Sequence, residues 1–252
     1  VRMTRADKRN ALDMAMFGAL ADAGEHLKTA PGVRVAVLSG EGKSFCAGLD
    51  MSVMTALAGN RDEAAARAGD DNPGAMSASG ITHRGQQVAW VWQEVPVPVI
   101  AAVHGHALGG GIQIALGTDI RIVHPDTKLS VREVYWGLVP DMTGTLFLSR
   151  LVGADVAKEL VFTARIFDGR EGQRLGLATR LADDPYAEAM SLAEQIAALS
   201  PDAVRGAKEL LNQLFNAGAG DQFAREREVI SRLVGRPNQV EAVMASFENR
   251  PA

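Results

Sequence analysis

Hydrophobic residues at spacings of three and four predict the first helix of the chain. Over residues 10–29 this spacing joins Leu12, Met16 and Leu20, and a Pro-Gly pair follows at residues 31–32. Such a stripe is typical of an amphipathic helix, and proline after it marks the end.

Two short apolar runs predict buried strands in the first half of the chain. One covers residues 33–38, and the other covers residues 95–103, where prolines stand only at the entry. Residues 81–94 return to helical spacing between them. Residues 52–80 are rich in Ala, Gly and Asp, which favours a mobile excursion with some helix over residues 62–68. Helix and strand therefore alternate, as in an α/β layer architecture.

The second half of the chain changes from strands to helices. Residues 120–123 and 128–131 predict two further short strands around a turn. After Pro140 the spacing is helical, and no repeat or low-complexity linker interrupts it. The predicted helices cover residues 146–151, 155–162, 169–175, 186–199, 202–215, 220–233 and 238–247.

Composition and charge exclude several classes of protein. Hydrophobic residues make up 47% of the 252 residues and charged residues 22%, with mean hydropathy near zero, as in an ordinary globular domain. No apolar stretch approaches the ~18 residues that a membrane-spanning helix needs. The net charge of −4 with mixed signs argues against nucleic-acid binding. Cys46 is the single cysteine, so no internal disulfide can form, which predicts a reducing, cytoplasmic location.

Two glycine-containing junctions carry the candidate chemistry. FCAGLD at residues 45–50 and GGG at residues 109–111 each lie between a predicted strand and a predicted helix. Such junctions expose backbone N–H groups, and two of them facing one oxygen would form an oxyanion hole. Alternatively, the glycines serve only tight turns and close packing. Neither junction has the pattern of a P-loop or of a dinucleotide-binding loop.

The chain resembles the crotonase (enoyl-CoA hydratase/isomerase) superfamily in a series of motifs that occur in the order of that family and extend to the C-terminal ENRP at residues 248–251. The motifs are RADKRNAL at residues 5–12, FCAGLD at 45–50, HGHALGGGIQ at 104–113, DIR at 119–121 and REVYWGLVP at 132–140.

This resemblance implies an α/β fold that is a spiral of ββα units with a C-terminal helical trimerisation region. Residues 1–190 would form the spiral core with the acyl-CoA site, and residues 191–252 the helical oligomerisation region. The implied substrate is an acyl-CoA thioester with no separate cofactor, and the implied assembly is a homotrimer or a dimer of trimers.

The resemblance also implies the binding residues. The backbone N–H groups of Leu49 and Gly110 would form the oxyanion hole. The adenine of coenzyme A would lie beside the backbone around Leu49, and basic side chains, one of them from a neighbouring subunit's tail, would reach its phosphates. The residues concerned are Cys46, Ala47, Leu49, Lys8, Arg9 and Arg250.

The acid and base positions differ from those of a typical hydratase. Hydratases of the family carry glutamate at the two positions that Gln113 and Glu133 occupy here. Glutamine cannot exchange a proton at neutral pH, so Glu133 would act alone, as in the isomerases of the family. One-base isomerisation of an enoyl-CoA is therefore favoured. Hydration of a 2-enoyl-CoA and a non-catalytic acyl-CoA-binding role are the alternatives, and without the resemblance Glu133 would pass for a solvated charge.

Asp141 and Trp136 complete the candidates. Asp141 lies eight residues after Glu133, a spacing found in the dienoyl-CoA isomerases of the family, and either shuttles a proton or caps a helix. Trp136 is expected to touch the substrate and to raise the pKa of Glu133 by desolvation.

His104 and His106 have a spacing that suits a metal, but no further ligand is near them in sequence, and no metal site is predicted.

Overall fold

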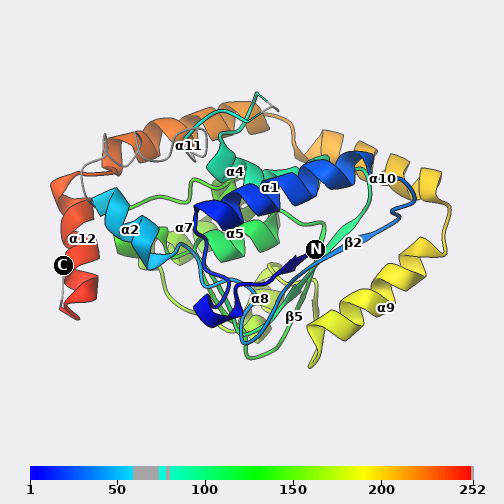
Figure 1. Cartoon of the computed structure of the whole chain (residues 1–252), viewed down its shortest axis with the longest axis horizontal. Helices are drawn as coiled ribbons and strands as arrows, with labels where there is room; N and C mark the ends of the chain where they lie inside the picture. Colours follow the sequence, from blue (N-terminus) through cyan, green and yellow to red (C-terminus); the bar gives the residue numbers. More distant parts are fainter. Residues whose placement is uncertain (59–73, 78–79, 251–252) are drawn as a thin grey trace.

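The computed structural model describes residues 1–58, 74–77 and 80–250 and shows a parallel sheet covered by helices (Figure 1). The five-stranded sheet has the order β1-β2-β3-β5-β7, and every pair in it is parallel. Its strands are β1 Arg2–Met3, β2 Ala36–Gly40, β3 Val99–Val103, β5 Ile120–Val123 and β7 Arg180–Leu181. A second, two-stranded parallel sheet pairs β4 His106–Leu108 with β6 Lys128–Ser130. The α/β class predicted from the sequence is confirmed.

The helices are bounded as follows. The first seven are α1 Met14–Thr29, α2 Met51–Ala58, α4 Arg84–Glu94, α5 Gly110–Leu116, α6 Gly144–Leu151, α7 Ala154–Thr163 and α8 Gly169–Leu175. The last four are α9 Pro185–Ala197, α10 Pro201–Phe215, α11 Ala219–Leu233 and α12 Pro237–Phe247. Two 3₁₀ helices, η1 Ala6–Lys8 and η3 Glu133–Trp136, lie before α1 and before α6.

Side chains of the central strand alternate between two apolar clusters, because successive residues of a strand point to opposite faces. Val99, Ala101 and Val103 of β3 join the main core with α1, α4 and α5. Ile100 and Ala102 face the other way, where they meet the apolar residues of α9. The sheet is therefore covered on both sides, which is why its strands are almost continuously apolar.

Several elements differ from those that the spacing predicts. The first helix begins at Met14 rather than at residue 10, because Asp13 caps it by accepting a hydrogen bond from the Met16 N–H at 2.9 Å. The strand predicted over residues 33–38 is β2 and starts at Ala36. Helix α2 is the helix expected after residues 45–50, although its bounds were not predicted, and the helix expected over residues 62–68 lies outside the described residues. Residues 120–123 and 169–175 have the predicted bounds.

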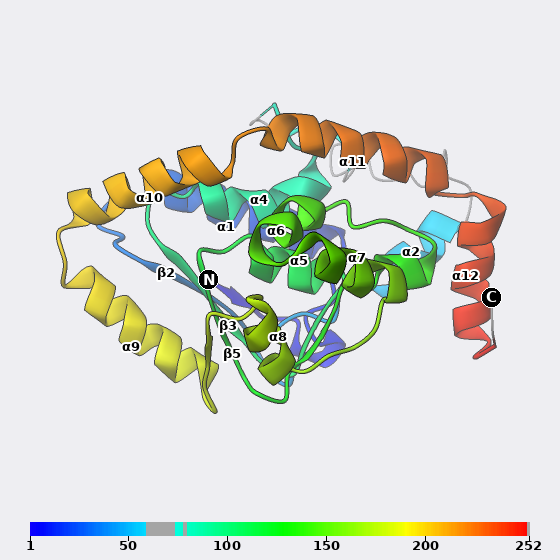
Figure 2. The same ribbon diagram turned by 180° about the vertical axis from the view of Figure 1, so that it is seen from behind.

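The C-terminal helices surround the rest of the chain. Helices α10 and α11 run along one edge of the molecule, and α12 lies beside α2 at its end (Figure 2). Helix α9 packs on the sheet along its length, through Ala189 on one side of residue 190 and Leu192 and Ala193 on the other. A boundary at residue 190 would cut this helix, although the division into two regions itself stays a prediction.

In the described part of the chain, no helix combines the length and the apolar character that crossing a membrane requires.

Lys208 fastens α10 to the core. Its ammonium group donates hydrogen bonds to the carbonyl oxygens of Trp92 at 2.9 Å and Val97 at 3.0 Å, and to the Asp119 carboxylate at 2.7 Å. Burial lowers the pKa of Lys208 and raises that of Asp119, so each group depends on the other to remain charged.

We expect Lys208→Met to lower the free energy of unfolding by about 3 kcal/mol, because it leaves the Asp119 carboxylate without its cation and two carbonyl groups without their donor. Urea denaturation at pH 7 measures the change. The exposed Lys158→Met serves as the control and should change it by less than about 0.5 kcal/mol. Equal midpoints for the two variants would contradict the role of Lys208.

Candidate active site

Two loops that each lead into a helix lie against one another. The Cys46 N–H donates to the His106 carbonyl at 2.9 Å, and the Leu108 N–H donates to the Cys46 carbonyl at 3.2 Å. These bonds bring the segment before α2 next to the segment before α5. The two glycine-containing junctions singled out in the sequence are therefore neighbours in the fold.

Glycine is required where the two loops meet. Gly48 has a φ of +93°, and a Cβ there would lie 2.7 Å from the Leu108 carbonyl oxygen. A Cβ on Gly111 would lie 2.3 Å from the Cys46 carbonyl oxygen. Any side chain would push the loops apart, so these glycines serve both the turn and the close approach.

The N–H groups of Leu49 and Gly110 donate no hydrogen bond within the part of the chain that the structure describes. The backbone groups around them are used: Gly48 accepts from Leu12, Asp50 donates to Leu12, and Gly109 donates to Ser130. Gly110 is the first residue of α5 and has no acceptor within the helix. Two backbone donors thus remain available where the loops meet.

Asp50 and Arg5 fix the first loop. Asp50 accepts hydrogen bonds from the Ser52 N–H at 2.9 Å and the Ser52 hydroxyl at 2.7 Å, at the start of α2. Arg5 donates to the same carboxylate at 2.6 Å and forms an ion pair with Asp13 at 3.1 Å. The Ser52 N–H and then Arg5 lower the pKa of Asp50 to about 2. The direction of the adjoining Leu49 N–H is therefore held by a charged network.

Glu133 lies beside the second loop. It is the first residue of η3, is 8% exposed, and its Oε1 atom would be 3.2 Å from a Cβ placed on Gly109. Oε1 accepts a hydrogen bond from Gln113 Nε2 at 2.6 Å, and the buried Oε2 atom has no partner among the described residues. Burial raises the pKa of Glu133 to about 7 against the opposing Gln113 hydrogen bond, and the charge of Glu226 adds to the rise.

The orientation of the Gln113 amide follows from its hydrogen bonds. Its Oε1 atom accepts from the N–H groups of Met142 at 3.0 Å and Gly144 at 2.9 Å. Since both of these groups are donors, the carbonyl of the amide must face them and the NH₂ must face Glu133. Gln113 is fully buried, so this arrangement is shielded from water.

Asp141 is half-buried in the turn that precedes α6. Burial, then the charges of Glu226 and Glu133, raises the pKa of Asp141 to about 8. The N-cap of α6 is Thr143, so the alternative that Asp141 caps this helix is wrong.

Glu226 is a carboxylate near the site that the sequence analysis missed. It lies on α11 and is 4% exposed. It falls three residues after the buried Phe223, on the core-facing side of the helix. A charged residue at such a position is the signal that could have revealed it, because buried acids are rare unless they have partners.

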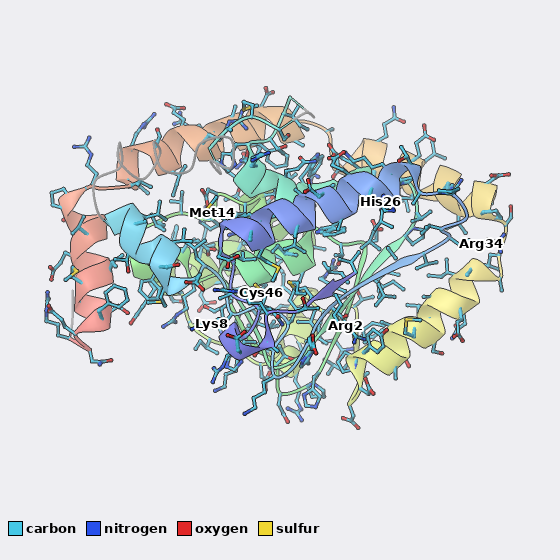
Figure 3. All side chains as sticks on the ribbon, viewed as in Figure 1. Arg2, Lys8, Met14, His26, Arg34 and Cys46 are labelled. Atoms are coloured by element: carbon cyan, nitrogen blue, oxygen red, sulfur yellow. The ribbon has the colours of Figure 1, made fainter. Side chains whose placement is uncertain are left out.

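Among the residues predicted to bind coenzyme A, Lys8 and Arg9 are exposed, and the Arg9 carbonyl accepts a hydrogen bond from the Ala47 N–H at 3.0 Å. Lys8 lies at the edge of the molecule, whereas Cys46 lies inside it (Figure 3). Cys46 is fully buried, and burial raises the pKa of its thiol to about 12, as is typical of a packed thiol rather than of a nucleophile. Ala47 and Leu49 are half-buried.

Trp136 and Arg250 lie in different surroundings. Trp136 is half-buried and packs with Leu49 against the apolar cluster of Met54, Leu138 and Val243. The loop of residues 45–50 thus has an apolar neighbour between α2 and α12. Arg250 is exposed beyond the end of α12 and forms ion pairs with Glu241 and with Glu248, the latter at 2.6 Å.

The two histidines near the site are engaged by the loop that follows β2. His104 Nε2 lies 2.9 Å from the Gly42 carbonyl oxygen, and His106 Nδ1 lies 2.9 Å from the Ser44 hydroxyl. Within the described ranges, no three His, Cys, Asp or Glu side chains are arranged to hold a metal ion.

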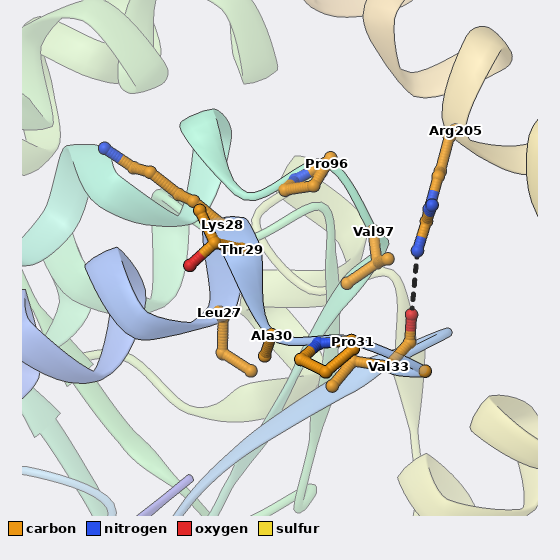
Figure 4. A pocket seen from close by; sticks show the side chains of 10 residues that line it. Leu27, Lys28, Thr29, Ala30, Pro31, Val33, Pro96, Val97 and Arg205 are labelled. Atoms are coloured by element: carbon orange, nitrogen blue, oxygen red, sulfur yellow. Dashed lines mark hydrogen bonds between the residues drawn. The ribbon is translucent and has the colours of Figure 1, made fainter.

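A surface hollow of about 230 Å³ lies elsewhere, at the end of α1 (Figure 4). It is lined by residues 27–33 together with Pro96, Val97 and Arg205, and Arg205 donates to the Val33 carbonyl at 3.1 Å. No carboxylate belongs to this lining, and the Lys28 ammonium group is engaged in ion pairs with Glu25 and Glu94.

Comparison with known proteins agrees with this geometry. A family model described as enoyl-CoA hydratase/isomerase matches residues 1–252. A probable enoyl-CoA hydratase of Mycobacterium leprae (strain TN) is 31% identical over 252 residues, which cover 99% of this chain and 91% of that protein. The mitochondrial methylglutaconyl-CoA hydratase of Mus musculus is 30% identical over 256 residues, covering 99% of this chain and 76% of that protein.

The fold has similar solved structures. The crystal structure of an enoyl-CoA hydratase/isomerase from Mycobacterium paratuberculosis superposes with a TM-score of 0.84 at 26% identity, covering 96% of this chain and 93% of the other. The crotonase-like α/β fold expected from the motifs is thereby confirmed. The chain belongs to the enoyl-CoA hydratase/isomerase family.

Proposed function

We propose that this protein isomerises the double bond of an enoyl-CoA, with Glu133 as the base. The observation that carries the proposal is the direct 2.6 Å hydrogen bond from Gln113 Nε2 to Glu133 Oε1. It pairs one carboxylate with an amide that cannot exchange a proton, and it leaves the second oxygen of Glu133 free to do so.

In the proposed reaction the thioester oxygen of a 3-enoyl-CoA accepts hydrogen bonds from the Leu49 and Gly110 N–H groups. Glu133 Oε2 takes a proton from C2, and the electrons of that C–H bond delocalise into a dienolate that the two amides stabilise. A proton is then given to C4, so that the double bond lies between C2 and C3. Removing one such donor costs other enzymes about 3 kcal/mol of transition-state stabilisation, so two donors would supply a large share of the rate.

Hydration is the second candidate, because relatives of the chain are named as hydratases. It requires a water molecule placed to attack C3 and a group that gives a proton to C2. The short contact between Gln113 and Glu133 leaves no space for a water between these two side chains. Water would have to approach from the Oε2 side, with Glu133 performing both proton transfers.

We propose Asp141 as the acid of the second step: it gives its own proton to C4 and is then reprotonated by Glu133, so that one proton is returned for the one taken from C2. A pKa of about 8 keeps it largely protonated at pH 7, whereas a pKa of about 7 leaves a large fraction of Glu133 ionised. Two carboxyl groups with separated pKa values are suited to acid and base roles. A non-catalytic, acyl-CoA-binding member is the remaining alternative, and an absence of turnover with both 3-enoyl-CoA and 2-enoyl-CoA would favour it.

We further propose that coenzyme A is held, as the motifs imply, by the backbone of residues 46–49 and by Lys8 or Arg9, with Arg250 contributed by another copy. Cys46 uses both its N–H and its carbonyl in the fold, so the half-buried Ala47 and Leu49 offer more of this contact. Trp136 would cover the acyl chain. No cofactor is required, because the backbone amides stabilise the enolate.

We propose that the protein assembles as a homotrimer or a dimer of trimers. Helix α10 supports this assembly, because it carries large apolar side chains that this chain leaves exposed. They are Leu210, Leu211, Leu214 and Phe215.

We expect Glu133→Gln to lower the turnover of 3-enoyl-CoA isomerisation by ~10²–10⁴, because the amide keeps the shape of the side chain but cannot exchange a proton. Steady-state kinetics on purified protein measure the loss, with circular dichroism to check folding. Glu194→Gln, exposed on α9, is the matched control and should retain wild-type turnover. Isomerisation at a near wild-type rate in Glu133→Gln would refute the assignment.

Asp141→Asn should lower the same turnover by ~10-fold or more, because asparagine cannot give a proton to C4. The fall should appear in kcat rather than in KM, since binding of the CoA ester does not need this proton. A variant with unchanged kcat would leave Asp141 without a part in the reaction.

Gln113→Glu should raise the rate of 2-enoyl-CoA hydration by ~10-fold or more relative to isomerisation. The new carboxylate can still accept from the Met142 and Gly144 N–H groups, but it repels Glu133 and opens a place for water between them. Parallel assays of the two reactions measure the ratio, and Gln195→Glu on the surface of α9 is the control. Wild-type protein that hydrates faster than it isomerises would favour the second candidate.

A further inference from the structure

Glu226 reaches from α11 into the turn between η3 and α6. Its Oε2 atom accepts hydrogen bonds from Gln86 Nε2 at 2.9 Å and from the Thr143 N–H at 3.1 Å, and its Oε1 atom accepts from the Thr145 hydroxyl. Gln86 uses its other amide hydrogen on the Phe223 carbonyl at 3.1 Å. The carboxylate is therefore tied to α4, to its own helix and to the turn.

Three successive N–H groups of this turn point at two side chains. Those of Met142 and Gly144 donate to Gln113, and that of Thr143, between them, donates to Glu226. Because the three groups belong to adjacent residues, moving the one held by Glu226 must move the two that orient Gln113. Gln113 in turn donates to Glu133. Hydrogen bonds and the backbone of the turn thus form a continuous path from α11 to the proposed base.

The turn does not hold this shape through local preference. Thr143 is buried with φ of +71°, a left-handed conformation that a β-branched residue adopts only at a cost of about 1–2 kcal/mol. Its hydroxyl also has no hydrogen-bond partner among the described residues. Contacts from outside must keep the turn in place, and the hydrogen bond from its N–H to Glu226 is one of them.

The groups around Glu226 leave its charge without an ion-pair partner in the described part of the chain. Arg227 donates to the Ile81 carbonyl and to Gln86 instead, and burial lowers the pKa of His83 to about 4, so that it is neutral. The titratable and charged residues on η3, α4, α6 and α11, at the start of α4 and in the turn before α6 are His83, Arg84, Glu94, Glu133, Tyr135, Asp141, Arg150, Asp221, Arg225, Arg227, Glu228 and Arg232.

We propose that Glu226 is a positioning residue for the reaction: it holds the 141–144 turn so that Gln113 presents its amide to Glu133, and it adds negative charge beside Glu133 and Asp141. This inference rests on the proposed function, in which Glu133 is the base. In the proposed function, α11 supplies no group that touches the reacting atoms. The inference gives α11 an influence on the site through Glu226.

The test compares Glu226→Ala and Glu226→Gln with Glu228→Gln, an exposed control on the same helix. Glu226→Ala releases the turn, so kcat for isomerisation should fall by ~10- to 100-fold while KM changes by less than about threefold. Glu226→Gln retains an oxygen that can accept from Gln86 and Thr143, so its maximal kcat should lie between those of Glu226→Ala and the control.

The pH profile separates the charge from the structural contact. Glu226 raises the pKa of Glu133, so its neutralisation in Glu226→Gln favours the ionised form of the base. The acid limb of kcat should therefore move to lower pH in this variant, by up to about one pH unit, and should stay in place in Glu228→Gln. A merely structural contact would leave the limb where it is.

A second substitution tests the strain in the turn. Thr143→Gly relieves the left-handed conformation, so in combination with Glu226→Ala it should recover part of the lost kcat. An unmoved acid limb in Glu226→Gln, together with a kcat in Glu226→Ala equal to that of the control, would overturn the inference. If Glu226→Ala does not fold, the pH profile of Glu226→Gln alone decides. Wild-type turnover in Glu133→Gln, by contrast, would refute the proposed function itself.

Discussion

Gln113 donates a hydrogen bond to Glu133 across 2.6 Å in a buried site, and the arrangement of the surrounding elements serves that contact. Helix α5 supplies the amide, η3 supplies the carboxylate, and the turn before α6 fixes which end of the amide faces the acid. A carboxylate buried without a donor would become protonated and lose its use as a base. The amide therefore moderates the effect of burial, which would otherwise raise the pKa of Glu133 further.

The acidic residues around this contact oppose one another, which has a cost in stability. Glu133, Asp141 and Glu226 all have pKa values raised chiefly by burial, and the charge of Glu226 adds to the rise at Glu133 and at Asp141. For Glu133, the difference between 4.5 and about 7 corresponds to roughly 3 kcal/mol of lost stability once the pH exceeds both values. The sign follows because the unfolded chain ionises first as the pH rises. Apolar packing on both faces of the sheet must offset this loss.

The sequence allowed the elements and motifs that surround the site to be predicted. It did not allow the orientation of the side chains within the site to be predicted. Helical spacing and β-branched runs located β5 and α8, since these elements follow from local pattern. Family motifs placed Glu133 and the two glycine loops. The direction of the Gln113 amide depends on N–H groups about thirty residues further along the chain. The bounds of helix α2 were not predicted, because its start depends on Asp50, whose charge is held by Arg5.

One fold can support isomerisation and hydration if backbone N–H groups stabilise the enolate and side chains exchange the protons. The proposed oxyanion hole uses N–H groups at Leu49 and Gly110, and their positions depend on close loop packing at Gly48 and Gly111 rather than on the identity of a reactive side chain. Enolate stabilisation is then common to both reactions, and what differs is the set of groups that can exchange a proton beside it. In this chain that set depends on position 113, because a glutamine there donates directly to Glu133, the proposed base, and stands in place of a second carboxylate.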